Sequence, residues 1–320
     1  MSKINKITFI KGPGTGKGPD RTAIYAFICL ISVGVLLAAS LIIGKLADTA
    51  AAPRLTFLLL AMLGAGVVLG LVAIVQRQAM PFNRRTLEYA VISGLLIALP
   101  NALGFLAIRH VGAGFISLSF AFPILLTWVL AVFLGMERLR IMRFIGVLLG
   151  LSGGIVLALA KSGSAGEAQA WVMLVLTMPL VLALGNIYRT LRWPDAASPV
   201  FLAAIMMFGG ALSLLPFVLL IEPGQMSELF KSQDSINLLL LEVAVFAVLY
   251  LLYFVLQKLA GPVYLSQIGT VAALSGTSFA VFVLGESAPA NLALAAGLVI
   301  IGTFLFHRGT QAAKQDCVAS

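Results

Sequence analysis

Ten apolar runs, separated by short charged or Pro/Gly-rich breaks, follow one another along the chain. They cover residues 22–44, 55–76, 88–108, 113–134, 143–160, 169–188, 200–221, 237–257, 262–284 and 289–306. An α-helix needs roughly 20 residues to cross a ~30 Å hydrocarbon layer, and most of these runs have about that length. The pattern predicts an all-α integral membrane protein of about ten transmembrane helices.

The composition supports lipid as the solvent of this fold. Of the 320 residues, 61% are apolar and 10% are charged, and the mean hydropathy is +1.07. A soluble domain is usually about a quarter charged. The first run is too long for a signal-peptide core and lacks a convincing cleavage site, so we expect it to remain as a helix. The chain is therefore expected to be a multi-pass protein of the cell (inner) membrane.

The distribution of Lys and Arg predicts how the helices are oriented, because these residues resist translocation. With the N-terminus in the cytoplasm, 16 of the 21 Lys and Arg fall on the cytoplasmic side, Arg143 and Arg189 among them. The external side has only Lys45, Arg54, Arg109, Lys161 and Lys231. Both termini are therefore predicted to be cytoplasmic. This topology accounts for the net charge of +9, and we expect no nucleic-acid partner.

Neither the N-terminal tail nor the Cys and His residues indicate a cofactor. The tail, residues 1–21, contains the run from Lys11 to Gly18, which resembles a phosphate-binding loop. It has Lys11 where the first Gly is needed and Gly18 where Ser or Thr should bind magnesium. We expect a disordered, basic, cytoplasmic tail. The Cys and His residues are too far apart to predict a metal site, namely Cys29, Cys317, His110 and His307.

The chain matches itself at an offset of 149 residues. Arg109 then aligns with Lys258, Gly112 with Gly261, Ser117 with Ser266, Glu137 with Glu286 and Gly153 with Gly302. Each half contains five predicted helices, and an odd number places matching residues on opposite faces of the membrane. We therefore predict two inverted five-helix repeats, at 22–161 and 169–306, with an external linker at 162–168 and a cytoplasmic tail at 307–320. Inverted repeats are typical of alternating-access transporters.

The repeated motifs resemble a known family. In the first half, a run from Ser117 to Pro123 leads to Gly135-Met-Glu137, with Gly146 and Gly153 following at intervals of nine and seven. The second half has a similar series from Ser266 through Glu286 to Gly302. This looks like the paired EamA domains of the drug/metabolite transporter superfamily. The resemblance implies a central cavity and transport, often export, of amino acids or related metabolites and drugs.

Three positions depart from the family pattern. The Trp-Gly pair common in its first helix is absent, Ala272 replaces the second-half Pro, and Ser287 replaces the Arg after Glu286. Expectations about substrate contacts in the first helix therefore do not carry over.

Polar residues inside a membrane must find protein partners or line a wet cavity, so they indicate which helices surround a pathway. They concentrate in the third, fourth, sixth, eighth and ninth runs, with Ser32 and Ser40 added by the first. Pro100, Pro123 and Pro179 are expected to lie inside helices and to permit kinks. The candidate substrate or pathway residues are Asn101, Ser117, Trp128, Asn186, Tyr188, Glu242, Tyr250, Tyr253, Gln267 and Ser275.

Glu242 is the most specific candidate. It shares one helix face with Tyr250, Tyr253 and Gln257, so the eighth run carries a polar stripe. A buried carboxyl there could carry a proton or bind a substrate ammonium. The alternative is a carboxylate that reaches headgroups or entrance water, because Glu242 lies only about five residues, or ~7.5 Å, from the predicted outer end.

Taken together, the sequence predicts a secondary transporter or exporter of a small metabolite, such as an amino acid or amine, working by alternating access. A proton-independent facilitator is the alternative within transport. An intramembrane enzyme lacks a nucleophile and base at a common depth, and a scaffold or receptor lacks a binding domain. No Lys or Arg is expected in the middle of a cavity helix, which argues against a phosphate clamp. The expected partners are a small-molecule substrate and the lipid bilayer, and a homodimer stays open; we expect no cofactor and no enzymatic activity.

Overall fold

A computed structural model of the chain describes residues 21–137, 139–161 and 167–285, and residues 293–294, 296–298, 300–302 and 304–306. The predicted N-terminal tail up to residue 20, most of the predicted linker, Glu286 and the C-terminal tail lie outside these residues. The helices are α1 (Arg21–Thr49), α2 (Arg54–Val75), α3 (Arg84–Val111), α4 (Ala113–Ser119), α5 (Pro123–Phe133), α6 (Ile141–Lys161), α7 (Glu167–Val175), α8 (Met178–Leu191), α9 (Pro199–Ile221), α10 (Met226–Leu229), α11 (Gln233–Leu265) and α12 (Ile268–Phe282).

The helices confirm an all-α integral membrane protein. Seven stretches of the described chain are long and apolar enough to cross a membrane: α1, α2, α3, α4 with α5, α7 with α8, α9 and α11. Three shorter apolar helices, in α6, α12 and Ala296–Phe306, fall where the fifth, ninth and tenth predicted runs lie. The short α10 lies in the connection between α9 and α11. Each of the ten apolar runs therefore contains a helix in its described part.

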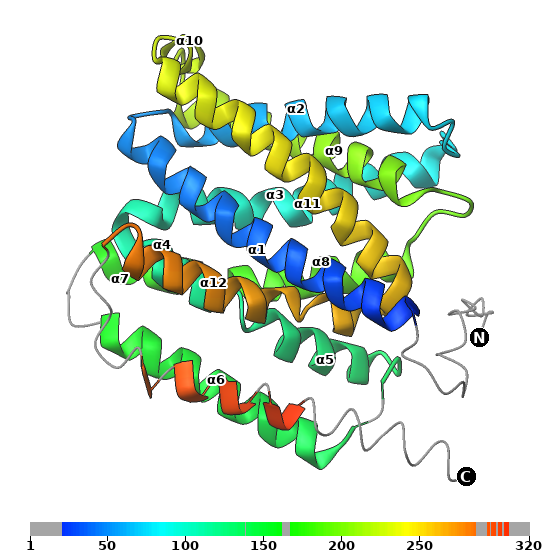
Figure 1. Cartoon of the computed structure of the whole chain (residues 1–320), viewed down its shortest axis with the longest axis vertical. Coiled ribbons are helices and arrows are strands. Elements are labelled where there is room, and N and C mark those ends of the chain that lie inside the picture. Colours follow the sequence, from blue (N-terminus) through cyan, green and yellow to red (C-terminus); the bar gives the residue numbers. More distant parts are fainter. Residues whose placement is uncertain are drawn as a thin grey trace.

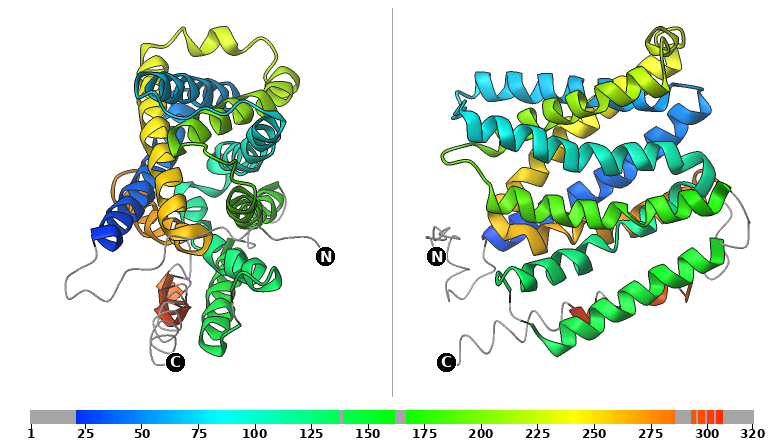
Figure 2. Two further views of the ribbon diagram at one scale, coloured as in Figure 1. Left: turned by 90° about the vertical axis from the view of Figure 1, so that its right-hand side faces the viewer. Right: turned by 180° about the vertical axis from the view of Figure 1, so that it is seen from behind.

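The helices lie side by side and are stacked along the longest axis of the molecule (Figure 1). The helices α2, α3 and α9 lie at one end of this stack, whereas α1 and α11 cross it obliquely. At the other end α6 lies beside the segment 293–306, as both views of Figure 2 also show. A Cβ added to Gly146 would come within 2.6 Å of the Gly302 carbonyl oxygen, so the backbones of this pair are in close contact.

The fourth and sixth predicted runs are each interrupted. The first is divided into α4 and α5 by Phe120–Phe122, and Pro123 is the first residue of α5. The second is divided into α7 and α8 near Thr177, and Pro179 lies in the first turn of α8. Proline lacks an N–H but fits the first helical turn, where that group has no helical partner. The expectation that Pro123 and Pro179 lie inside helices was therefore wrong; Pro100 does lie inside α3.

The backbone repeats at the same offset as the sequence. Asn83 and Ser232 cap the starts of α3 and α11, and each side-chain oxygen accepts a hydrogen bond from the N–H three residues ahead. Gly112 ends α3 with φ 81° and ψ 158°, and Gly261 breaks α11 with φ 77° and ψ 178°. This region is essentially restricted to glycine. Both pairs are 149 residues apart, and α11 is therefore two helices that meet at Gly261.

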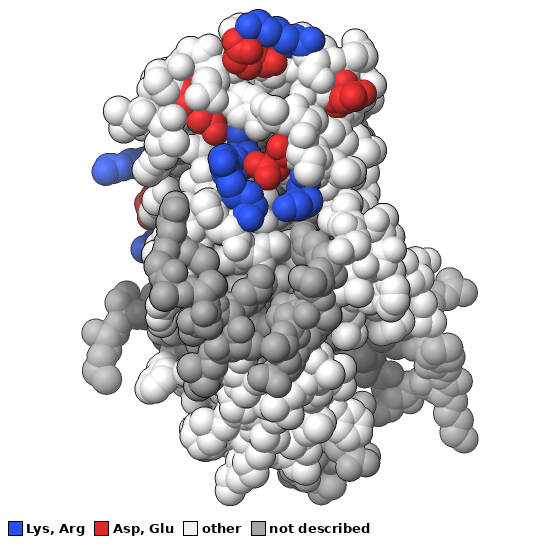
Figure 3. Space-filling model, turned by 90° about the vertical axis from the view of Figure 1, so that its left-hand side faces the viewer, with Lys and Arg blue, Asp and Glu red and all other residues white. Residues whose placement is uncertain are grey.

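Figure 3 faces the surface at the left-hand side of Figure 1, and the Lys, Arg, Asp and Glu side chains that it shows lie near one another in its upper half. The described ion pairs of the two connections at this end join Arg54 to Asp48 at 3.2 Å and Lys231 to Glu228 at 2.6 Å. The sequence predicts that this end is external.

Candidate functional site

A polar stripe runs along the buried face of α11. Glu242, Tyr250, Tyr253 and Gln257 have exposed fractions of 0%, 1%, 8% and 3%. Intervals of eight, three and four residues keep successive side chains within about 80° of one another on a 3.6-residue helix. The helix is regular there because its break lies beyond the stripe, at Gly261. The stripe predicted from the sequence therefore faces the protein interior.

Glu242 lies at one end of the stripe. Its Oε1 accepts a hydrogen bond of 2.5 Å from the Ser40 hydroxyl of α1, and its Oε2 has no hydrogen-bond partner among the described residues. Because the side chain is fully buried, the alternative of a carboxylate that reaches headgroups or entrance water was wrong. Glu242 is a titratable group that a single hydroxyl neighbour satisfies only in part.

Tyr250 connects α11 to the first half of the chain. Its hydroxyl accepts a hydrogen bond of 3.2 Å from the Asn101 side chain of α3, and the two residues are 149 positions apart. Positions related by the repeat can touch each other only near the axis that relates the halves. Phe120 and Gly269 are also 149 apart, and a Cβ on Gly269 would clash with the Phe120 carbonyl. The Asn101–Tyr250 contact therefore joins two positions that the offset of 149 aligns.

Tyr253 joins α11 to α8 through Asn186 and Arg189. Arg189 donates from Nη2 to the Tyr253 hydroxyl at 2.6 Å and to Asn186 Oδ1 at 3.0 Å. The Tyr253 hydroxyl in turn donates to Asn186 Oδ1 at 2.5 Å. The guanidinium carbon also lies 5.2 Å from the centre of the Tyr253 ring, where a cation is attracted to the π face. These three side chains form one connected polar group.

Gln257 closes the other end of the stripe. Its side-chain amide donates to the Thr190 hydroxyl at 2.9 Å and to the Asn186 carbonyl at 3.2 Å. We define the polar column as the four stripe residues and the polar side chains bonded to them. Its members are Ser40, Asn101, Asn186, Arg189, Thr190, Glu242, Tyr250, Tyr253 and Gln257. The column connects α1, α3, α8 and α11, which come from both halves of the chain.

Arg189 corrects one expectation. It was counted among the cytoplasmic loop charges, yet it lies in the last turn of α8 with an exposed fraction of 0%. Because this position is at the end of the helix, it does not contradict the expectation that no Lys or Arg lies in the middle of a pathway helix. One signal could have located it, because the offset of 149 aligns Arg189 with Ser40, which lies well inside the first apolar run.

Five of the ten candidate residues belong to the column, and a sixth lies beside it. The five are Asn101, Asn186, Glu242, Tyr250 and Tyr253. Tyr188 is half-buried, and its ring stacks on Tyr89 with the ring centres 6.0 Å apart. Because Tyr188 directly precedes Arg189 on α8, this aromatic pair adjoins the column.

The other four candidates lie apart from the column. The Ser117 hydroxyl faces Gly276 of α12, and the Trp128 ring packs edge-on against Phe306 with the ring centres 5.8 Å apart. Ser275 donates back to the Val271 carbonyl of its own helix at 2.6 Å. Gln267 precedes α12 as its N-cap residue but makes no side-chain capping bond. The structure thus divides the ten candidates into those in or beside the column and those in scattered helix contacts.

Missed polar residues include Tyr89 and Thr190, besides Arg189. The exposed fraction of Tyr89 is 1%, and its hydroxyl has no hydrogen-bond partner among the described residues. Tyr89 falls near the predicted start of the third helix, and Thr190 falls beyond the predicted end of the sixth. Both were left out of the candidate pathway residues because of these positions.

Within the described residues, no group of three His, Cys, Asp or Glu side chains could hold a metal ion. His110 instead stacks on Trp171 with the ring centres 4.7 Å apart. Arg143, another cation assigned to the cytoplasmic side, is buried, bonds to Glu137 at 2.9 Å and lies over the Phe306 ring. The contact of Arg143 with the Phe306 ring holds the start of α6 against the last helix.

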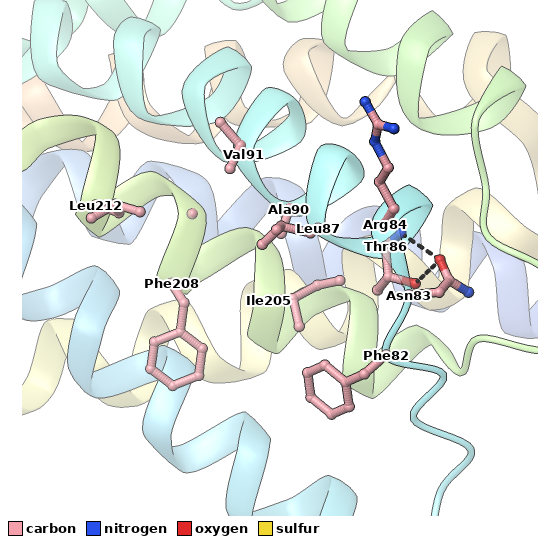
Figure 4. Close-up of a pocket in the computed structure, with 11 residues that line it drawn as sticks. Phe82, Asn83, Arg84, Thr86, Leu87, Ala90, Val91, Ile205, Phe208 and Leu212 are labelled. Atoms are coloured by element: carbon pink, nitrogen blue, oxygen red, sulfur yellow. Dashed lines mark hydrogen bonds between the residues drawn. The ribbon is translucent and has the colours of Figure 1, made fainter.

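An apolar groove lies between α3 and α9, away from the polar column. It has a volume of about 510 Å³, and its lining residues come from the start of α3, the residues before it and the facing side of α9 (Figure 4). At its polar end Asn83 accepts hydrogen bonds from the Thr86 N–H and hydroxyl, at 2.9 and 3.1 Å. A smaller apolar pocket of about 170 Å³ lies between α2, α3 and α9. Neither contains a column residue.

Comparisons with known proteins identify the second half of the chain. Residues 169–308 match the model of the EamA-like transporter family, and this range coincides with the second predicted repeat. A solved structure titled "Crystal structure of protein" is similar with a TM-score of 0.61 and 18% identity, covering 89% of this chain and 96% of that chain. At that identity the likeness shows the fold alone. No curated protein matches the chain. The second half is therefore an EamA family domain, consistent with a membrane transporter of the drug/metabolite type.

Proposed function

We propose that the whole chain is a secondary transporter or exporter of the drug/metabolite superfamily, with a second EamA-like domain in its first half and the inner membrane as its location. It moves a small metabolite by alternating access. The observation that carries this proposal is the polar column, a row of buried polar side chains on α11 with hydrogen-bond partners from both halves of the chain. A buried polar network inside a membrane helix bundle marks a substrate or ion pathway more often than a purely structural contact.

The position of the column supports alternating access. Asn101 and Tyr250 meet near the axis that relates the halves, and transporters built from inverted repeats bind substrate at the repeat interface. Glu242 lies on one side of this contact along α11, and Tyr253 and Gln257 lie on the other. A rocking motion of one half against the other would open the column towards one membrane face at a time. Eight of the nine column residues are buried, as a closed state of this cycle would require.

Glu242 gives the transport cycle a titratable group. Its second oxygen is free to accept a hydrogen bond from a proton carrier or a substrate ammonium. A carboxyl that exchanges its proton during the cycle would couple transport to the proton gradient, whereas a facilitator would work without it. These two mechanisms predict different responses to pH.

Solute counterflow in proteoliposomes tests the proposal. Purified protein would be screened with labelled amino acids, amines, purines and sugars, with protein-free liposomes as the blank. We expect exchange of at least one class above the blank. Exchange of none would contradict the transport function.

The role of Glu242 is tested on the solute found in that screen. Glu242→Gln should lose the pH dependence or the cation preference of exchange, because the amide keeps the hydrogen bond with Ser40 but cannot titrate. Glu228→Gln is the matched control, since Glu228 is an exposed carboxylate paired with Lys231. An unchanged rate, affinity and pH profile in Glu242→Gln would rule out this role and leave a proton-independent facilitator.

A further inference from the structure

Arg189 places a positive charge inside the protein without a negative partner. Its side chain is fully buried, and none of the ion pairs in the described part of the chain includes it. The guanidinium stays protonated in proteins, so it cannot escape burial by losing its charge. The residues bonded to it, Asn186 and Tyr253, are neutral acceptors, and they compensate the charge only in part.

Two of its three nitrogen atoms remain available. Nη2 makes both hydrogen bonds, whereas Nε and Nη1 have no partner among the described residues. The buried hydroxyl of Tyr89, whose ring stacks on Tyr188 next to Arg189 in the chain, also has no hydrogen-bond partner among the described residues. Buried polar groups are nearly always hydrogen-bonded, so a cluster of free donors around one cation has the chemistry of an anion site.

The scaffold does not require an arginine at this position. The repeat aligns Arg189 with Ser40, so the corresponding place in the first half holds a small hydroxyl. Gly185, one turn earlier on α8, leaves room for the guanidinium: a Cβ there would come within 2.9 Å of Nη1 and 3.0 Å of Nη2. The positive charge is therefore present in the second half and not at the matching position of the first half. Gly185 is small enough to leave room for the Arg189 guanidinium.

We propose that Arg189 binds the carboxylate of the transported substrate, which is an amino acid or another small monocarboxylate. This inference rests on the proposed transport function and narrows its substrate class. One carboxylate oxygen replaces Asn186 or Tyr253 on Nη2, and the other pairs with the adjacent free nitrogen. This gives the two parallel bonds that a guanidinium forms with a carboxylate.

A monoanion fits this site better than a phosphate group. Arg189 is a single buried cation, and its nearest basic neighbour along the helix, Arg192, is exposed. Arg143 is buried but already paired with Glu137. One guanidinium with tyrosine hydroxyls around it balances one negative charge, whereas a phosphate monoester carries nearly two at neutral pH.

The site is distinct from Glu242. Tyr253, which contacts Arg189, follows Glu242 by 11 residues on α11, or roughly 16 Å along the helix axis. A small substrate cannot contact both groups at once. Arg189 lies in the last turn of α8, at the end predicted to face the cytoplasm, so it would receive the carboxylate on that side of the pathway.

Competition against counterflow in proteoliposomes tests this inference on the wild-type protein. The competitors are amino acids, the amines obtained by removing their carboxyl groups, their carboxamides, and inorganic phosphate. We expect the free carboxylates to compete roughly 10- to 100-fold better than the matched amines and carboxamides, because hydrogen bonds to a charged group are lost. The inferred carboxylate site would be overturned if amines and carboxamides competed as well as the free carboxylates, or if phosphate competed better than they do.

Variants test whether the preference for carboxylates depends on Arg189. Arg189→Lys keeps the charge but loses the planar fork, and should weaken carboxylate competition by at least about tenfold. Arg192→Lys is the control from the same helix end and should change nothing. Exchange of amines without any carboxylate would leave transport standing and refute the Arg189 site. A lack of exchange by every solute would refute transport itself.

Discussion

At the scale of single residues, Glu222 illustrates a buried carboxylate with a structural role. Its exposed fraction is 8%, and it accepts hydrogen bonds from the Leu55 N–H at 3.0 Å and the Thr56 N–H at 2.8 Å. The Thr56 hydroxyl donates to it as well, at 2.9 Å. These are the first backbone donors of α2, which have no partner within their own helix. Glu222 thus closes the start of α2 from the end of α9, and Glu242 has no comparable set of partners.

Glu222→Gln should lower the thermal stability of the protein. The amide retains one acceptor oxygen but loses the negative charge at the helix N-terminus, at a cost of about 1 kcal/mol. Thermal unfolding of the purified protein in detergent measures the loss as a lower melting temperature. Glu228→Gln changes an exposed carboxylate in the same connection and should have little effect. A melting temperature for Glu222→Gln no lower than that of the control would refute the capping role.

The residue types and their spacing predicted part of the candidate site. Glu242, Tyr250 and Tyr253 were predicted to share one helix face, because a helix has a fixed period. Arg189 was missed because the orientation rule treats every Arg near the end of a run as a loop charge. The contacts of Glu222 could not be predicted either, since they join segments 166 and 167 residues apart. Pairing across such distances depends on how the helices stack.

At the scale of helices, glycine contacts set how closely neighbours approach. A Cβ added to Gly94 of α3 would clash with the backbone of Gly209 and Gly210 in α9, and one added to Gly209 would clash with the Ala90 carbonyl. The two backbones therefore meet where neither helix has a side chain. Packing of this kind is common where lipid provides no hydrophobic force between helices.

Gly209→Ala should separate α3 from α9 and destabilise the protein. The new methyl group would overlap a backbone carbonyl that a change of side-chain rotamer cannot move, so we expect a loss of about 1–3 kcal/mol. Gly70→Ala on α2 is the control, because its Cβ would lie 3.9 Å from the nearest atom, on Phe208. Thermal unfolding in detergent would compare the two variants. Equal melting temperatures would show that the contact tolerates a side chain.

The sequence predicted the helices better than their interruptions. Long apolar runs determine where a membrane helix lies, and each of the ten runs contains a helix in its described part. The breaks near Phe120 and Thr177 were missed because the apolar pattern continues through them. Pro123 and Pro179 were interpreted as kinks, although proline also favours the first turn of a helix, and only the surrounding packing decides between the two.

At the scale of the whole molecule, the sidedness of the helices is open to direct measurement. The connection after α2 is predicted to be cytoplasmic and the connection after α9 external. In a variant without Cys29 and Cys317, single cysteines would replace Gln76 and Gln225, which are both exposed. A membrane-impermeant maleimide added to spheroplasts should label Gln225→Cys at once and Gln76→Cys only after permeabilisation. The reverse result would invert the predicted topology.

The contact between Asn101 and Tyr250 has a consequence for what two separate copies of one half could achieve. Such copies would place the same side chain on both sides of the axis, so asparagine would face asparagine and tyrosine would face tyrosine. A single covalent chain removes that restriction, and an amide donor can then face a phenol acceptor. The same freedom allows one half to hold Arg189 where the other has Ser40, and Glu242 where the other has Ser93. Joining the halves lets a nearly symmetric shell enclose a polar interior with distinct ends.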